Sequence, residues 1–155
     1  MGSVFRDLIV LDVEAADCVD AIHKVGARLF EGGYVKDSYI DAVAAREDEF
    51  PTGLILEDIN IAMPHTSGTH VNKPAVCVAK LKNPVVFGHM GDPDTKVNAE
   101  LLFMMAIKNP DEQVETLQNV MGVFTNSEAV AALKAASDEE TLYAVAKKYI
   151  DKEEI

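Results

Sequence analysis

Short apolar runs alternate along this chain with segments whose apolar residues recur every three or four positions. The first run, 8–13, is suited to a strand because it is mostly apolar over a strand's length. The next segment predicts a helix that begins at about Asp17 and ends at Gly32-Gly33, since glycine closes many helices. The residues expected to form the buried stripe of this helix are Cys18, Ile22, Val25 and Leu29.

A second helix is expected from near Asp37, and it would carry Arg46 at its carboxyl end. Its buried stripe would consist of Tyr39, Ile40, Val43 and Ala44. Two apolar segments, 54–56 and 59–63, flank Glu57-Asp58 and predict a pair of strands joined by a tight turn. The pattern therefore changes from helix to hairpin shortly after Arg46.

Three further apolar segments favour β structure. Two of them, 75–81 and 84–87, are separated by Lys82-Asn83-Pro84, which should break the strand because proline cannot donate to a ladder. The third, 101–107, is apolar enough for a strand that is covered on both faces, although its periodicity alone also fits a buried helix.

The carboxyl third of the chain predicts three helices. Asn109 can cap the first, with Pro110 at its first helical position, and Ser127-Glu128 can open the second. A capping box, Ser137-x-x-Glu140, should begin the third, and 151–155 is expected to be a frayed tail. The inner stripes would be Val114, Leu117, Val120 and Phe124 in the first helix and Leu142, Val145, Ala146 and Tyr149 in the last.

The order of these elements predicts an α/β protein with a mixed sheet between helical layers, in one domain that spans residues 1–155. A domain of this length can bury roughly 70% of its unfolded surface, so it needs no metal or disulfide to fold. Cys18 and Cys77 lie in apolar surroundings at a spacing that matches no zinc or redox motif. This pattern favours two buried, reduced thiols.

Charge and hydropathy exclude two classes of partner. The chain has 26 acidic and 14 basic residues, a net charge of −12, which would repel a nucleic-acid backbone. No apolar run approaches the roughly 18 residues of a membrane span, and the first residues lack the charged and apolar regions of a signal peptide. We therefore expect a soluble, cytoplasmic protein that neither binds nucleic acid nor inserts into a membrane.

Candidate chemistry centres on His65, which follows the apolar run Ile61-Ala62-Met63-Pro64. Pro64 fixes its own backbone, so the imidazole would be held on rigid chain yet face outward, although a merely structural or solvated histidine fits the pattern equally well. Upstream, Arg46 and the turn Phe50-Pro51-Thr52-Gly53 offer a guanidinium, a hydroxyl and an amide as donors to an anion. A nucleophilic nitrogen beside anion donors suggests phosphoryl chemistry.

These motifs together resemble the IIA component of the sugar phosphotransferase system. The resemblance rests on Arg46-Glu47, the Phe50–Gly53 turn, the Ile61–His65 run, the Pro-Val-Val-Phe segment at 84–87, and the 101–107 run before Asn109-Pro110. It covers the chain from about residue 5 to residue 150 and is to the mannitol/fructose type (type 2), in particular its galactitol-specific branch. It implies a single IIA domain with the fold of that type.

The resemblance also implies a reversible phosphoryl relay that needs no cofactor. The phosphocarrier protein HPr would transfer a phosphoryl group to Nε2 of His65, forming a tele-phosphohistidine, although the group that orients the ring is not assigned from the sequence. The phosphoryl group would then pass to a cysteine of a IIB component and on to galactitol or a related sugar entering through the membrane component IIC. Arg46 would stabilise the transferred group, with Thr52 second. The alternative for the arginine is an ion pair with Glu47 or another nearby carboxylate at a solvated helix end.

One position departs from much of the family. The mannitol and nitrogen-regulatory types usually carry a second histidine near the start of the helix after Asn109, and helix alignment places Gln113 there. Glutamine can donate a hydrogen bond to the phosphoryl group but cannot titrate near neutrality. Gln113 is what a galactitol-like protein would carry, and a solvent-facing residue of the first helical turn is the alternative.

Other functions remain open at this point. A regulatory, nitrogen-type IIA module could use phosphorylation of His65 to switch partner binding, without feeding a sugar. A metal-dependent hydrolase would need a site such as His65, His70, His89 and Asp92, but no helical spacing supports it, and we expect no metal. His23, beside a helical stripe, is expected to be a packing or surface residue.

Overall fold

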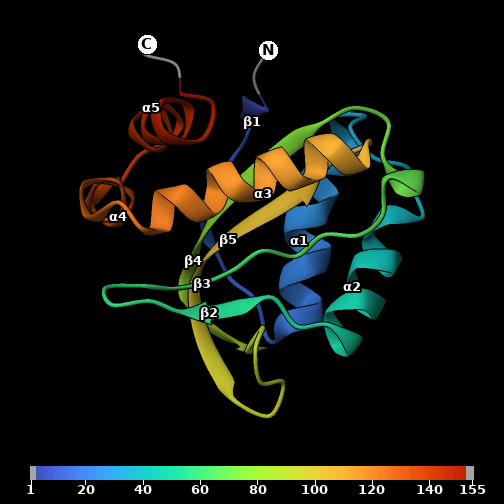
Figure 1. Ribbon diagram of the computed structural model, residues 1–155, viewed down its shortest axis with the longest axis horizontal. Helices are drawn as coiled ribbons and strands as arrows, with labels where there is room; N and C mark the ends of the chain where they lie inside the picture. The colour runs from blue at the N-terminus through green and yellow to red at the C-terminus, as the bar shows by residue number, and fades with distance from the viewer. Residues whose placement is uncertain (1–2, 153–155) are drawn as a thin grey trace.

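Within residues 3–152, the part of the chain that the computed structural model describes, five strands form one mixed sheet with helices on both faces (Figure 1). The strand order is β1-β4-β5-β3-β2. β4 and β5 are antiparallel at the centre, β1 and β3 add in parallel on either side, and β2 pairs antiparallel with β3. The strands are β1 (Val4–Val13), β2 (Gly53–Ile55), β3 (Asn60–Ala62), β4 (Ala75–Gly88) and β5 (Lys96–Ala106).

Two apolar clusters, one on each side of the sheet, form the core. The first lies beneath α1 and α2, and the second beneath α3, α4 and α5 (Figure 1). The helices are α1 (Cys18–Glu31), α2 (Tyr39–Glu49), α3 (Pro110–Phe124), α4 (Ser127–Ala135) and α5 (Glu139–Ile150), with a short 3-10 turn at Gly68–His70. The predicted mixed sheet between helical layers is confirmed.

The second half of the central strand β5, residues 101–106, is apolar throughout because it is buried on both faces. Leu101 and Phe103 point into the second cluster, whereas Leu102 and Met104 point into the first, as the two-residue period of a strand requires. The helix that periodicity alone allowed at 101–107 is therefore excluded. The strand also begins earlier than predicted, at Lys96.

The predicted break at Lys82-Asn83-Pro84 is wrong, because β4 runs without interruption from Ala75 to Gly88. The pairing with β5 shifts register between Lys80 and Val85, and this irregularity accommodates the proline. Two predicted strands are thus one long strand. β1 likewise begins at Val4, earlier than the predicted 8–13.

The first two helices begin close to where the sequence indicates. Asp17 caps α1, and its side chain accepts the N–H of Asp20 at 2.8 Å. Gly32 closes the helix, and Gly33 follows with a φ of +78°, a conformation that glycine adopts without strain. α2 begins at Tyr39, two residues after the predicted start near Asp37.

Details of the carboxyl-terminal helices differ from the predictions. α3 begins at Pro110 as expected. Val114 of the predicted stripe is 56% exposed, whereas Val123, which the predicted stripe does not include, is buried. The stripe of α3 therefore faces the sheet only in its second half. The predicted cap of α5, Ser137, is wrong by one residue. The residue that caps the helix is Asp138, whose side chain accepts the N–H of Thr141 at 2.7 Å.

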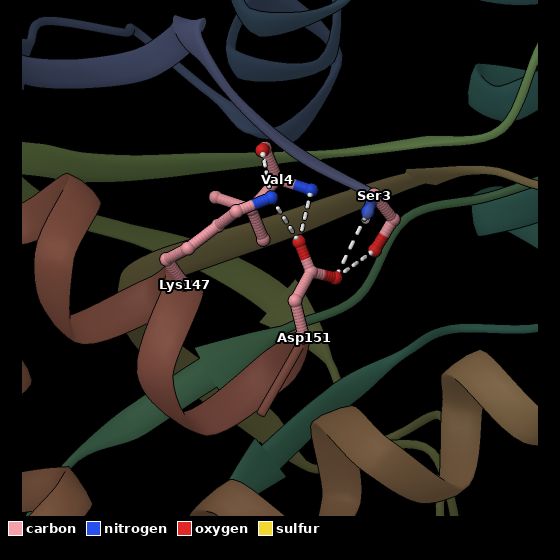
Figure 2. A network of polar contacts seen from close by, with 4 residues as sticks. All are labelled: Ser3, Val4, Lys147 and Asp151. Carbon is pink, nitrogen blue, oxygen red and sulfur yellow. Dashed lines mark hydrogen bonds and ion pairs between the residues drawn. The ribbon is translucent and has the colours of Figure 1, made fainter. Parts of the chain in front are cut away.

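Asp151 is not part of a frayed tail, contrary to the prediction for 151–155. Its carboxylate accepts hydrogen bonds from the N–H and hydroxyl of Ser3 and from the N–H of Val4, and it pairs with Lys147 (Figure 2). This network joins the start of β1 to the end of α5. Residues 153–155 lie outside the described part of the chain.

The remaining expectations concern thiols and the membrane. Cys77 is buried and Cys18 is half-buried, so the prediction of two buried thiols holds fully for Cys77 only. Burial raises the pKa of both thiols to about 12. Among the helices in residues 3–152, none has the length and apolar character needed to cross a membrane.

Candidate functional site

His65 lies just past the end of β3, where the chain continues along the central strand β5. The histidine pairs with Met105 as an isolated parallel bridge, and the N–H of Met105 donates to the carbonyl of Pro64 at 3.0 Å. Pro64 has no N–H to donate, and its carbonyl makes the ladder contact that fixes the chain before the histidine. The backbone of His65 is thereby held on the most buried strand of the sheet.

The imidazole ring is oriented by the backbone of Met63. Nδ1 of His65 lies 2.7 Å from the carbonyl oxygen of Met63. Because a carbonyl oxygen can only accept, Nδ1 carries the proton, and the lone pair of the neutral ring is on Nε2. The geometry thus supplies the orienting group that the sequence left unassigned.

The environment of His65 favours the neutral ring. Burial lowers the pKa of His65, the hydrogen bond to Met63 opposes this effect, and the positive charge of Arg46 lowers the pKa further. The residue as a whole nevertheless remains partly exposed. At neutral pH His65 therefore combines an available lone pair with access from solvent.

Arg46 lies in the last turn of α2 and is exposed. Its guanidinium carbon is 5.4 Å from the centroid of the Phe50 ring, a cation–π arrangement that leaves its N–H groups accessible. Among the ion pairs of the described residues, none involves Arg46. The alternative of an Arg46–Glu47 ion pair is not seen, because the Glu47 carboxylate turns toward Thr52.

Thr52 is buried and its hydroxyl is used within the protein. The hydroxyl donates to Glu47 at 2.8 Å and accepts the N–H of Met63 at 3.0 Å. Since a hydroxyl has one proton, none is left for a phosphoryl oxygen. This geometry argues against the predicted direct contact of Thr52 with the phosphoryl group. Thr52 instead holds the segment that leads to His65, through its hydrogen bond with Met63.

Gln113 lies in the first turn of α3, next to the histidine segment. Its side-chain amide approaches the carbonyl of Thr66, the residue after His65, at 3.4 Å. The helix thus packs its start against the chain that carries the imidazole. The contact is to the backbone beside His65, and Gln113 is partly exposed.

The other histidines have separate partners. His23 is 4.0 Å from Asp41, His70 shares a hydrogen bond with Ser38, and Nδ1 of His89 accepts the N–H of Gly91. No three His, Cys, Asp or Glu side chains between residues 3 and 152 come together as a possible metal site. The four-residue set that includes His65 and His89 is therefore not assembled.

Sequence reasoning missed two groups, the Glu47 carboxylate as a buried hydrogen-bond partner and the Met63 carbonyl. A signal for the first was present, because Tyr39, Val43 and Glu47 follow one another at four-residue spacing and all face inward. A glutamate on the buried face of a helix is expected to have a specific partner. Nothing in the sequence identifies a particular backbone carbonyl.

His65 is not among the residues that line a hollow of about 450 Å³ beside α2. That hollow lies between the start of α1, the end of α2 and the β4–β5 hairpin, with Cys18, Glu47 and Lys96 in its walls. A partly exposed histidine outside this cavity suits a reaction partner that is itself a macromolecule.

Comparisons with known proteins agree on one family. A family model described as "Phosphoenolpyruvate-dependent sugar phosphotransferase system, EIIA 2" matches residues 3–149. The galactitol-specific EIIA component of the phosphotransferase system of Escherichia coli K12 is 30% identical over 121 residues, 78% of this chain and 80% of that protein.

Solved structures share the fold. The crystal structure of the mannitol IIA protein of Escherichia coli superposes with a TM-score of 0.76 at 24% identity, over 93% of this chain and 99% of that one. The mannitol IIA enzyme in its complex with phosphorylated IIB from the same organism gives a TM-score of 0.73 at 25% identity, over 94% and 95% of the two chains.

Proposed function

The chain belongs to the EIIA 2 family of phosphoenolpyruvate-dependent sugar phosphotransferase systems, and from that premise we propose that it carries a phosphoryl group on Nε2 of His65. Members of this family are phosphotransferase relay components. The observation that carries the proposal is the 2.7 Å hydrogen bond from Nδ1 to the Met63 carbonyl, which leaves the lone pair on Nε2.

The donor in this proposal is the phosphohistidine of the phosphocarrier protein HPr. The Nε2 lone pair attacks phosphorus, a new N–P bond forms, and the N–P bond of the donor breaks with its electron pair returning to the donor imidazole. Negative charge is spread over the three phosphoryl oxygens during this step, and Arg46 offers donors to them from the end of α2. The lowered pKa of His65 keeps the nucleophile neutral.

The acceptor is the thiolate of a cysteine on a IIB component. The solved complex of the Escherichia coli mannitol IIA enzyme with phosphorylated IIB supports this part of the proposal. The sulfur attacks phosphorus, the bond to Nε2 breaks, and the imidazole of His65 regains its lone pair. A membrane component IIC would then admit the sugar that receives the group.

The proposed substrate class is galactitol or a related polyol. The galactitol-specific relative supports it. The sugar would bind the other components, so this domain needs no sugar pocket.

The test is the intact mass of the protein after incubation with phosphoenolpyruvate, enzyme I and HPr. Wild type and His89→Ala should each gain one acid-labile phosphoryl group, and His65→Ala should gain none. Adding a cognate IIB should then remove the group from wild type. Absence of label on wild type, with a control IIA labelled in parallel, would overturn the proposal. Label that forms but never passes to IIB would favour the regulatory alternative.

A further inference from the structure

We propose that Glu47 is a positioning residue for the phosphoryl relay, holding the ring of His65 through Thr52 and the backbone of Met63. This inference rests on the proposed function, because it concerns how the same imidazole is kept ready for attack. It assigns a role to a buried carboxylate that contacts no reacting atom.

The Glu47 carboxylate is nearly inaccessible and is fully engaged with one residue. Its side chain is on the buried face of α2, and the whole residue is 5% exposed. One carboxylate oxygen accepts the N–H of Thr52 at 2.7 Å, and the other accepts the hydroxyl of Thr52 at 2.8 Å. A carboxylate accepts both bonds at once, whereas an amide of the same shape would place a donor against one of them.

The hydrogen bond to Glu47 fixes the direction of the Thr52 hydroxyl. With its proton committed to the carboxylate, the hydroxyl oxygen can only accept from its other neighbours. That neighbour is the N–H of Met63, at 3.0 Å. Without the carboxylate, the hydroxyl would be free to rotate and its hold on Met63 would weaken.

Met63 connects this chain of contacts to the ring. Its side chain is fully buried, its N–H is held by Thr52, and its carbonyl accepts from Nδ1 of His65. The position of that carbonyl decides which ring nitrogen keeps the proton, and therefore which nitrogen can attack phosphorus. The two bonds on Met63 lie in different peptide planes, so the influence of Glu47 is exerted through position.

One helical turn also carries two side chains of the proposed site. Arg46 and Glu47 are adjacent at the end of α2. The first points its guanidinium outward, and the second points inward toward the segment that ends in His65. The last turn of α2 therefore carries both the proposed anion donor and the carboxylate that holds the histidine segment through Thr52.

The experiment uses ¹⁵N NMR of the His65 ring in the unphosphorylated protein, together with the rate of phosphoryl acceptance from HPr. The variants are Glu47→Gln, Thr52→Val and Thr52→Ser, with Asp48→Asn as the matched control that removes an exposed carboxylate from the same turn. Thermal unfolding of each variant reports whether it is folded.

In wild type, Asp48→Asn and Thr52→Ser, we expect one tautomer with the proton on Nδ1. Glu47→Gln and Thr52→Val should show a mixture of tautomers and accept the phosphoryl group roughly 10- to 100-fold more slowly, the scale of loss expected for a slightly misplaced nucleophile. Rescue by Thr52→Ser separates the hydroxyl from mere filling of space.

Folded Glu47→Gln and Thr52→Val proteins with the wild-type tautomer and rate would overturn the inference. If Glu47→Gln does not fold, the comparison of Thr52→Val with Thr52→Ser decides the matter in the same way. Failure of the proposed function is distinguishable, because the tautomer is measured without any phosphoryl donor and the rate of wild type is measured separately.

Discussion

Replacing Asp151 by asparagine should lower the free energy of unfolding by about 3 kcal/mol. The carboxylate is 6% exposed and accepts four hydrogen bonds, at 2.8 and 2.9 Å from Ser3, 3.0 Å from Val4 and 2.9 Å from Lys147 (Figure 2). Asparagine keeps one acceptor oxygen and turns an NH₂ group toward the remaining donors. About two bonds to a charged acceptor are lost, at roughly 1.5–3 kcal/mol each, and the lower cost of burying a neutral amide offsets part of this.

Thermal unfolding at neutral pH measures the effect. For a domain of this size, about 3 kcal/mol corresponds to a decrease in Tm of roughly 6 to 12 °C. Ser3→Ala, which removes only the hydroxyl contact, should cause a smaller decrease. A Tm of the Asp151→Asn protein within about 1 °C of wild type would refute the reasoning, because it would mean that the network contributes no net stability.

The pH dependence supplies a second check with a defined sign. Burial alone would raise the pKa of Asp151, but the hydrogen bonds from Ser3, Val4 and Lys147 outweigh it and hold the pKa below its ordinary value. A lowered folded-state pKa stabilises the protein above the unfolded-state value of about 3.9, and this stabilisation is lost as the pH falls through the folded-state value. The difference in Tm between wild type and the variant should therefore shrink only in acid, below about pH 4.

Other predictions concern the site and the core. Arg46→Ala should slow phosphoryl acceptance about 100-fold, as loss of one charged donor does, and unchanged single-turnover rates would remove it from the site. Acceptance by His65 should persist below pH 6.5, where an ordinary histidine is more than half protonated, because the pKa of His65 is lowered; a pH–rate midpoint above about 6.5 would contradict this. Gln113→Ala should slow acceptance at most about fivefold, as expected for one neutral hydrogen bond, in the same assay. Val120→Ala should cost about 2 kcal/mol in denaturant unfolding, whereas exposed Val114→Ala should stay within about 0.5 kcal/mol.

The fold could be predicted from the sequence where apolar spacing and helix ends are distinct. The mixed sheet is confirmed, and so are the end of α1 at Gly32 and the start of α3 at Pro110. The two helix ends are predictable because their signals act over a few neighbouring residues. Pro84 misled the prediction of β4, since a register shift against β5 absorbs a proline and such a shift depends on the partner strand. Val114 misled in the same way, because only the packing of α3 on the sheet decides which turn is buried.

For the candidate site, the sequence predicts residue types but not the geometry in which they are held. The order of Arg46, Thr52 and His65 along the chain indicated phosphoryl chemistry, yet the inward direction of the Thr52 hydroxyl follows from a contact with Glu47. The orientation of the imidazole likewise depends on a backbone carbonyl, which every residue possesses. Sequence therefore proposes the groups, and three-dimensional packing assigns their hydrogen-bond partners.

The backbone of Met105 joins the two elements on which the proposed reaction depends. Its carbonyl accepts the hydroxyl of buried Tyr39 at the start of α2, at 2.5 Å, and its N–H donates to Pro64, directly before His65. The helix that carries Arg46 in its last turn and the segment that carries the proposed nucleophile are thus tied to one residue of the central strand. In the proposed reaction, the entropic cost of holding these two elements side by side is met during folding, so a docking phosphoprotein need not supply it from its binding energy. We therefore expect the transfer rate to depend on how the partner docks and to need no closing motion of this protein.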